Sequence, residues 1–430
     1  MAALAFLAIS LACSTIIPLS KSEAPVPTPA APLGLIAYVG NDGNIYTTNT
    51  DGKQPNTVTQ DANLNPTAGQ VGRIYQYPTW APDGQHLAFA RFSLSQSGPE
   101  VSLFSALSDG KKPVNTFTSQ SFQPFYLSWS PNSQIIAFLG SDSSGMAQYL
   151  VAASGGESKF ISNGQPYYWD WSPDNQSLIV HIGGASSANP KARLAFIGLD
   201  GSNSKQELNL KPGSFEAPAW SPAGDALALA TQNDAGDEEL ILAGQDGKVK
   251  QVLTKLSGPV DFAWSPKGIY LAYAALDLTE SVPTIRLVVL DTAHPDLKNQ
   301  VDQGELVAFF WSPDGQKIAY FILGSQGPSA TSFQTVAQTK PGASLVVRVY
   351  DRISGDTKEV ATFAPTVSFQ QVLPLYSQYQ RSGSIWSPDS RNLVLSGIDS
   401  AGENAIYTVG ADGSQFQKIA DGDIAFWSWK

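Results

Sequence analysis

Seven copies of one short motif predict an all-β protein in which similar four-stranded sheets surround an axis, a β-propeller. Each copy is a tryptophan followed by Ser or Ala, then Pro, and most copies lie 42 to 49 residues apart. Each is followed by short runs of Val, Ile, Leu, Phe and Tyr that end at Gly or Asp, a pattern typical of strands. No window has a sustained helical period, so we expect very low helix content. A unit of this length with four strands is typical of a propeller blade.

The repeated tryptophan motif predicts a tight turn between the first and second strands of each unit. Proline presets φ for the first central position of the turn Ser-Pro-Asp-Gly, and Gly suits its end. Where Gly is replaced, Ser133, Asn175 and Ser390 stand in for it. We interpret the tryptophans as packing between neighbouring sheets rather than as ligands. They are Trp80, Trp129, Trp171, Trp220, Trp264, Trp311, Trp386 and the partial copy at Trp427.

The two ends of the repeat predict how the ring closes. Residues 35–59 contain the second to fourth strands of a unit but no preceding tryptophan motif, and "DIAFWSWK" at the C-terminus supplies one further strand. Pairing this strand with the N-terminal blade leaves no open sheet edge. Seven complete units and this composite unit predict eight blades over residues 33–430. Seven blades is the alternative, if one degenerate unit is not a blade.

The repeat also carries a family resemblance. The turn Trp-Ser-Pro-Asp-Gly, followed by Ile-Ala-Phe and then Ile-Tyr…Asp-Gly, resembles the repeat of the TolB-type (WD40-like) propellers over nearly all of residues 33–430. That family is related to the propeller of prolyl-oligopeptidase-family peptidases, in which a hydrolase domain follows the propeller. We expect no such domain here. TolB carries an α/β domain before its propeller that we do not find, so its partners are not carried over.

The N-terminal residues predict export. Residues 1–13, an uncharged apolar run ending at Cys13, resemble the end of a bacterial lipoprotein signal peptide, whose lipid-modified cysteine becomes the mature N-terminus. Residues 14–32 are Pro- and Ala-rich without hydrophobic periodicity, as in an extended tether. We therefore expect an exported protein, either a lipoprotein anchored through Cys13 or a periplasmic or extracellular protein. The lipid anchor would be its only membrane contact, and we expect a monomer.

Composition and motifs argue against several functions. The net charge of −11 would repel a phosphate backbone, so we expect no nucleic-acid partner. No G-x-S-x-G nucleophile motif occurs. The three histidines, His86, His181 and His294, do not converge by spacing on a metal site or a catalytic triad, and we expect no metal and no cofactor. Oligogalacturonate lyases resemble this repeat and use a histidine-rich metal centre, which this chain lacks the histidines to match.

Candidate ligand-binding residues lie on one face of the predicted propeller. Two kinds of loop reach this face: those that join the fourth strand of one unit to the first strand of the next, and those that join the second and third strands within a unit. We call it the loop-rich face. The opposite face carries the short tryptophan-motif turns, and we expect no specific pocket there. Aromatic side chains could stack on a sugar or grip a peptide, and Asp170 is the one charged residue among those directly preceding the tryptophans. The candidates are Tyr75, Tyr77, Tyr126, Tyr167, Tyr168, Asp170, Asp261, Tyr376, Tyr379 and Arg381.

Two long insertions in the unit between Trp311 and Trp386 reach the same face. Residues 324–344 are rich in Ser, Thr and Gln, whereas residues 362–383 are apolar enough to pack down as a lid. The sequence therefore predicts a non-catalytic binding or scaffolding module at the cell envelope that recognises a protein, peptide or glycan on the loop-rich face. A polysaccharide-active lyase or hydrolase with an unrecognised site, and a Tol-like component, are the alternatives.

Overall fold

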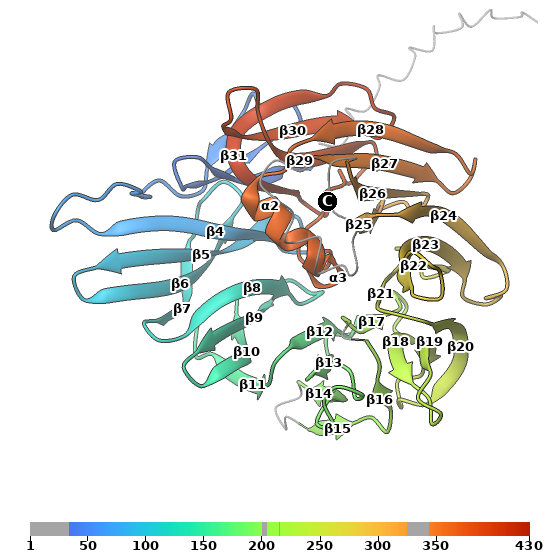
Figure 1. Ribbon diagram of the computed structural model, residues 1–430. Helices are drawn as coiled ribbons and strands as arrows, with labels where there is room; N and C mark the ends of the chain where they lie inside the picture. Colours follow the sequence, from blue (N-terminus) through green and yellow to red (C-terminus); the bar gives the residue numbers. More distant parts are fainter. Residues whose placement is uncertain (1–33, 200–203, 215, 325–343) are drawn as a thin grey trace, which may run out of the picture. The chain divides into compact units, whose positions relative to one another are not determined.

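In the computed structural model, antiparallel sheets follow one another around a ring (Figure 1). The structure describes residues 34–199, 204–214, 216–324 and 344–430, and residues 33–430 form one compact unit. The predicted leader and tether, with Cys13, and nearly all of the insertion at 324–344 lie outside the described residues. Among the described residues the strands form seven sheets.

Six of the sheets are built from consecutive strands, as the repeat predicts. The first three contain β4 (Gly72–Trp80), β5 (His86–Ser95), β6 (Gly98–Leu107) and β7 (Val114–Ser119); β8 (Gln123–Trp129), β9 (Ile135–Asp142), β10 (Gly145–Ala152) and β11 (Lys159–Asn163); and β12 (Tyr167–Trp171), β13 (Ser177–Ile182), β14 (Arg193–Gly198) and β15 (Lys205–Glu207).

The next three sheets continue the same order around the ring. They contain β16 (Lys211–Pro212), β17 (Ala219–Trp220), β18 (Leu227–Gln232), β19 (Glu238–Ala243) and β20 (Val249–Leu256); β21 (Val260–Trp264), β22 (Tyr270–Asp277), β23 (Thr284–Asp291) and β24 (Lys298–Gly304); and β25 (Leu306–Trp311), β26 (Lys317–Leu323), β27 (Leu345–Asp351) and β28 (Thr357–Phe363).

The seventh sheet joins the two ends of the described chain. It has six strands in the order β29 (Asn392–Ile398), β30 (Asn404–Gly410), β31 (Gln417–Trp427), β1 (Ile36–Gly40), β2 (Ile45–Thr48) and β3 (Asn56–Thr57). The first half of β31 pairs with β30 and its second half with β1, where Ile36 faces Trp427. The predicted closure of the ring by the C-terminal strand is therefore confirmed.

The blade count differs from the main prediction of eight. The described strands form seven sheets, which agrees with the seven-bladed alternative. The reason is the length of β31: because it continues without a break from β30 to β1, the unit headed by Trp386 and the composite N-terminal unit become one six-stranded sheet. The sequence contains both units but does not show that one strand is shared between them.

The tryptophan-motif turns have the predicted backbone. Ser133, Asn175 and Ser390 have φ of 61–62°, in the left-handed region, as does Gly84 with φ 70°. All three replacements also join neighbouring turns. Ser133 Oγ accepts a hydrogen bond from the amide of Asp83 at 3.0 Å, Asn175 Oδ1 accepts one from the amide of Asn132 at 2.9 Å, and Ser390 Oγ accepts one from the amide of Asp314 at 3.0 Å.

The tryptophans join neighbouring sheets by hydrogen bonds as well as by packing. The indole Nε1 of Trp129 donates to Thr79 O at 3.0 Å, and that of Trp311 donates to Ala263 O at 3.1 Å. Trp80, Trp264 and Trp386 make the equivalent bond. In each case the acceptor is the carbonyl just before the tryptophan of the preceding unit. Burial and a repeated hydrogen bond thus explain why a tryptophan recurs at the same place in successive units.

Within the described residues, helix is confined to one insertion, in agreement with the predicted low helix content. α2 (Val367–Val372), the 3-10 helix η1 (Leu373–Leu375) and α3 (Tyr376–Tyr379) follow one another across the centre of the ring (Figure 1). Thr366 caps α2, since its hydroxyl accepts a hydrogen bond from Phe369 N at 3.2 Å. Phe369 and Leu373 are buried, so the apolar insertion packs down as predicted. We call residues 366–383 the helical plug.

Candidate functional site

The helical plug is held in the ring by buried polar contacts centred on Gln378. Its side-chain Oε1 accepts a hydrogen bond from Trp169 N at 3.0 Å, and its Nε2 donates to Trp169 O at 3.0 Å. The phenol of Tyr126 donates to the Gln378 backbone carbonyl at 2.9 Å. Gln378 therefore forms with β12 the two backbone hydrogen bonds that a neighbouring strand would otherwise form. The plug is thus part of the fold and not a free loop.

An ion pair fixes the end of the plug. Arg381 Nη1 lies 2.7 Å from Asp170 Oδ2, and both side chains are largely buried. Asp170 also accepts hydrogen bonds from the amides of Trp171 at 3.0 Å and Trp220 at 2.8 Å. Burial raises the pKa of Asp170, although Arg381 acts in the opposite direction. The charged residue singled out before Trp171 therefore has an internal partner.

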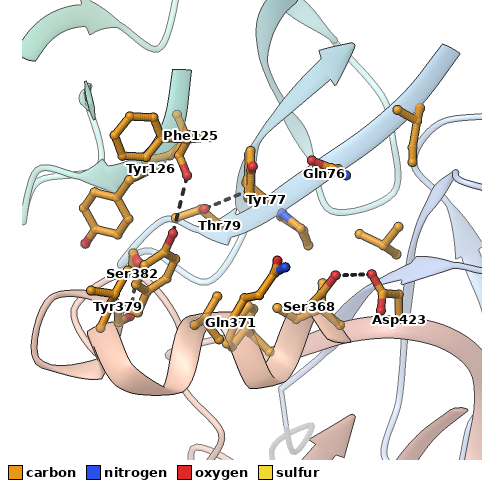
Figure 2. Close-up of a pocket in the computed structure, with 18 residues that line it drawn as sticks. Gln76, Tyr77, Thr79, Phe125, Tyr126, Ser368, Gln371, Tyr379, Ser382 and Asp423 are labelled. Atoms are coloured by element: carbon orange, nitrogen blue, oxygen red, sulfur yellow. Dashed lines mark hydrogen bonds between the residues drawn. The ribbon is translucent and has the colours of Figure 1, made fainter. Parts of the chain in front are cut away.

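A cavity of about 260 Å³ lies between the plug and the inner strands β4 and β8; we call it the aromatic cavity (Figure 2). Tyr77 and Phe125 reach it from the strands and Tyr379 from the plug. The Tyr379 hydroxyl donates to Phe125 O at 3.4 Å. Its other lining residues are Val39, Ile74, Gln76, Pro78, Thr79, Tyr126, Leu127, Ser368, Gln371, Val372, Leu375, Ser382, Asp423, Ile424 and Phe426.

Irregular backbone places the aromatic side chains at this cavity. The pairing of β4 with β5 shifts register between Gln76 and Thr79, and Tyr77 has φ 59°, which is rare for a residue with a large side chain. The pairing of β8 with β9 shifts between Pro124 and Tyr126. Bulges of this kind re-aim side chains beside functional sites.

The polar groups at the aromatic cavity are mostly uncharged. Gln76 and Gln371 present amides, and Gln371 is exposed. The one carboxylate, Asp423, accepts hydrogen bonds from the hydroxyl of Ser368 and from Asn404 Nδ2. Burial raises the pKa of Tyr77, so its phenol stays protonated and can donate a hydrogen bond. The cavity suits a ligand group that combines an apolar or ring surface with neutral hydrogen-bonding groups.

A cavity of about 450 Å³ lies among the tryptophan-motif turns, on the face where we expected no pocket. Its lining includes Pro82, Pro131, Trp429, Asp170 and Arg381. The turns are tight, but the space that they surround forms this cavity. Gln378 and Arg381 of the helical plug line it together with the turn residues. Asp170 and Arg381 therefore line this cavity and not the aromatic one.

A third cavity of about 660 Å³ lies where β12, β19 and β21 meet η1; we call it the acidic cavity. Tyr168 and Asp261 line it together with Glu216, Asp237 and Glu238. The Asp261 and Glu216 side chains hydrogen-bond to each other. Burial raises the pKa of Asp261 to about 7, and burial together with Asp261 raises that of Glu216 well above its ordinary value.

The structure separates the ten candidate residues into four groups. Three gather at the aromatic cavity (Tyr77, Tyr126, Tyr379), two at the turn-face cavity (Asp170, Arg381), two at the acidic cavity (Tyr168, Asp261) and three in the core (Tyr75, Tyr167, Tyr376).

Sequence reasoning missed several residues that shape these cavities. Gln378 carries no signal, because an isolated glutamine in an insertion is usually a surface residue. Glu216 has a weak signal in the sequence, because it lies four residues before Trp220, in the stretch that supplies aromatic or acidic residues in other units.

The histidines have ordinary structural partners. His86 Nδ1 lies 2.7 Å from Asp83 Oδ2, and His294 Nδ1 lies 3.8 Å from Asp291 Oδ2. His181 is buried, with Nδ1 2.8 Å from Glu216 O. Within the described ranges, no group of three or more His, Cys, Asp or Glu side chains is placed to hold a metal ion. In the same residues, no helix combines the length and apolar composition needed to span a bilayer.

Comparison with known proteins supports the fold alone. No protein-family model and no curated protein matches the chain. Among solved structures, TolB from Acinetobacter baumannii is 21% identical over 61% of this chain, with a TM-score of 0.37. The match spans 62% of that TolB, less than two thirds of its length.

Two other solved structures align more closely in space. An oligogalacturonate lyase in complex with manganese is 15% identical over 88% of this chain and 96% of its own, with a TM-score of 0.53. A prolyl endopeptidase is 11% identical over 82% of this chain and 50% of its own, with a TM-score of 0.55. At these identities the similarity defines the protein as an all-β propeller and says nothing of its activity.

Proposed function

We propose that this propeller is a non-catalytic binding module of the cell envelope that recognises a peptide or glycan segment of its partner through the aromatic cavity. The observation that carries the proposal is the convergence of Tyr77, Phe125 and Tyr379 with neutral amides at one cavity on the loop-rich face. Aromatic rings with a few polar groups are the usual lining of a specific binding site.

The chemistry of the lining narrows the ligand. The only carboxylate there is occupied by Ser368 and Asn404, and none of the described lining residues is Lys or Arg. A charged ligand group would lose its hydration without gaining a partner. We therefore expect the group that enters this cavity to be uncharged: an apolar or aromatic side chain, or a sugar ring.

The envelope location is proposed from the sequence of residues 1–32. Labelling of expressing cells with a fatty acid, comparing the wild type with Cys13→Ala, tests it. A wild type that is never labelled would contradict the lipid anchor without bearing on the cavity.

Screening a peptide display library and a glycan array against the full chain tests the binding function. Tyr77→Ala and Gln371→Ala should each weaken binding of any ligand found, by about 1–3 kcal/mol at a true hot spot. The matched control is Phe160→Ala, because Phe160 is 49% exposed on the outer strand β11 and lies outside this cavity. Equal effects of Phe160→Ala and Tyr77→Ala would overturn the assignment of the cavity, and turnover of the bound ligand would overturn the non-catalytic role.

A further inference from the structure

The acidic cavity contains two buried carboxyl groups for which the described part of the chain supplies no cationic partner. Asp261 is 3% exposed and Glu216 is 8% exposed. Glu216 Oε2 and Asp261 Oδ2 have no hydrogen-bond donor among the described residues. The two side chains hydrogen-bond to each other, which requires a proton on one of them, and the Glu216 carboxyl group also accepts hydrogen bonds from the Ser377 hydroxyl and the Ala217 amide.

This arrangement is costly when both groups are ionised. Removing a carboxylate from water without pairing it costs several kcal/mol, and two like charges in contact add to that cost. The other buried carboxylate in the ring, Asp170, is paired with Arg381 at 2.7 Å. The chain thus compensates one buried carboxylate with its own cation and leaves the Glu216–Asp261 pair without one.

The remaining lining does not supply a positive charge. None of the described residues that line the acidic cavity is Lys or Arg. Asp237 interacts with Lys255 at 3.4 Å, where both side chains are exposed, and Glu238 accepts a hydrogen bond from Ser214 Oγ at 2.5 Å. The local field in the cavity is therefore negative, and it favours a cation entering from solvent.

One part of the cavity wall is apolar, beside the polar side chains of Ser214, Gln232 and Ser257. Leu256, Pro259, Leu278 and Pro374 line it beside the ring of Tyr168. An apolar wall in the same cavity as two carboxyl groups matches an alkyl chain that ends in a positive charge, because the methylenes can pack on that wall while the head group is neutralised.

We propose that the acidic cavity binds the ammonium or guanidinium group of a lysine or arginine side chain of a partner peptide, with Asp261 and Glu216 as its counter-charges. A metal ion fits less well, because no third His, Cys, Asp or Glu in the described ranges joins the pair as a ligand. This site lies apart from the aromatic cavity, and the proposal does not depend on it.

Calorimetric titration of the full chain tests the proposal. The probes are N-acetyl-lysine methylamide and N-acetyl-arginine methylamide, with N-acetyl-norleucine methylamide as the uncharged probe of similar shape. We expect the cationic probes to bind and the norleucine probe to bind at least tenfold more weakly. Asp261→Asn and Glu216→Gln keep side-chain shape and remove a buried charge, so both variants should fold, which circular dichroism checks. Each should weaken the cationic probes at least tenfold.

Asp399→Asn is the control, since Asp399 pairs with Lys418 at 2.7 Å elsewhere on the ring and should not affect binding. Equal binding of the norleucine and lysine probes overturns the proposal, as does unchanged affinity in folded Asp261→Asn and Glu216→Gln. Failure of the wild type to bind either cationic probe, or binding of Ca²⁺ or Mn²⁺ alone with no binding of the lysine probe, also overturns it. None of these results bears on ligands of the aromatic cavity.

Discussion

The residue with the clearest physical role is the repeated tryptophan. Each indole fills space between adjacent sheets, and most of them donate Nε1–H to the carbonyl that precedes the tryptophan of the unit before. Trp220 is an exception, because its buried Nε1 has no acceptor among the described residues. At that point in the ring, the Asp170 carboxylate accepts a hydrogen bond from the Trp220 backbone amide at 2.8 Å.

This difference predicts unequal effects of the same substitution at two equivalent positions. Trp311→Phe removes the bond to Ala263 O and leaves a buried carbonyl unpaired, so we expect destabilisation by about 2–4 kcal/mol from lost volume and lost hydrogen bonding. Trp220→Phe loses volume but removes an unpaired donor, and should cost less. Urea unfolding of both variants followed by circular dichroism measures the difference. Equal midpoints would show that the indole hydrogen bond contributes nothing.

The Glu216–Asp261 pair predicts a pH dependence of stability. Burial raises the pKa of Asp261 to about 7, above its value in the unfolded chain, so the folded state binds more protons between these two values. The free energy of unfolding should therefore fall as the pH rises from about 4 through about 7. A cation bound at the pair would oppose this fall, because it would stabilise the ionised carboxylates of the folded state. His181, Tyr168 and Tyr376 are further titratable groups near the pair, and Asp237 and Glu238 line the same cavity.

Thermal unfolding between about pH 5 and about pH 8 tests this dependence. Asp261→Asn should flatten the profile and raise stability at the alkaline end. Asp399→Asn is the control, because hydrogen bonds from Lys418 and backbone amides lower the pKa of Asp399 to about 2, and it does not titrate in this range. If the melting temperatures of the wild type and of Asp261→Asn change with pH in parallel, the Glu216–Asp261 pair is not the source of the pH dependence.

At the scale of elements, the helical plug forms hydrogen bonds with an inner strand and lies between two of the cavities. An inner strand of a blade normally leaves backbone groups facing the central channel, and here Gln378 satisfies those of Trp169. The plug also separates the aromatic cavity from the acidic cavity, since Leu375 and Tyr379 line one and Pro374 lines the other.

Gln378→Ala should detach the plug and not simply shorten a side chain. It leaves the amide and carbonyl of Trp169 unpaired in a buried place, at about 1–3 kcal/mol for each group. We expect a lower melting temperature and faster hydrogen exchange at Trp169. Gln380→Ala is the matched control, because no hydrogen bond of the Gln380 side chain is seen in the described structure and its backbone amide still bonds to Tyr376 O. Unchanged exchange at Trp169 in Gln378→Ala would contradict a structural role for the plug.

At the scale of the whole molecule, β31 holds the ring together because it belongs to both halves of the six-stranded sheet. Trp427 is fully buried, and Trp80 Nε1 donates to Phe426 O at 3.1 Å across the closure. The described strands form seven sheets because β31 has no break at the boundary between its two partners.

Deletion of Asp423–Lys430 should therefore open the ring. β1 would lose its neighbour along Ile36–Val39, and an exposed sheet edge favours association between chains. We expect aggregation or a large fall in melting temperature, measured by light scattering and calorimetry. Lys430→Ala, at an exposed position, is the control. A deletion variant that stays monomeric with an unchanged melting temperature would refute closure through β31.

The sequence by itself determined the all-β repeat, its turns and the closing strand, because these follow from local chemistry: Pro and Gly in fixed turn positions, alternating apolar runs, and one aromatic per unit. Only the tertiary structure decided that β31 serves two units and that the insertion becomes a plug in the centre of the ring. Only the structure, too, divided Tyr77, Asp170 and Asp261 among separate cavities, and it supplied Glu216 as the neighbour of Asp261. Those outcomes depend on contacts between residues far apart in the chain, such as Tyr126 with Gln378, and no local pattern records which distant side chain will arrive beside a given residue.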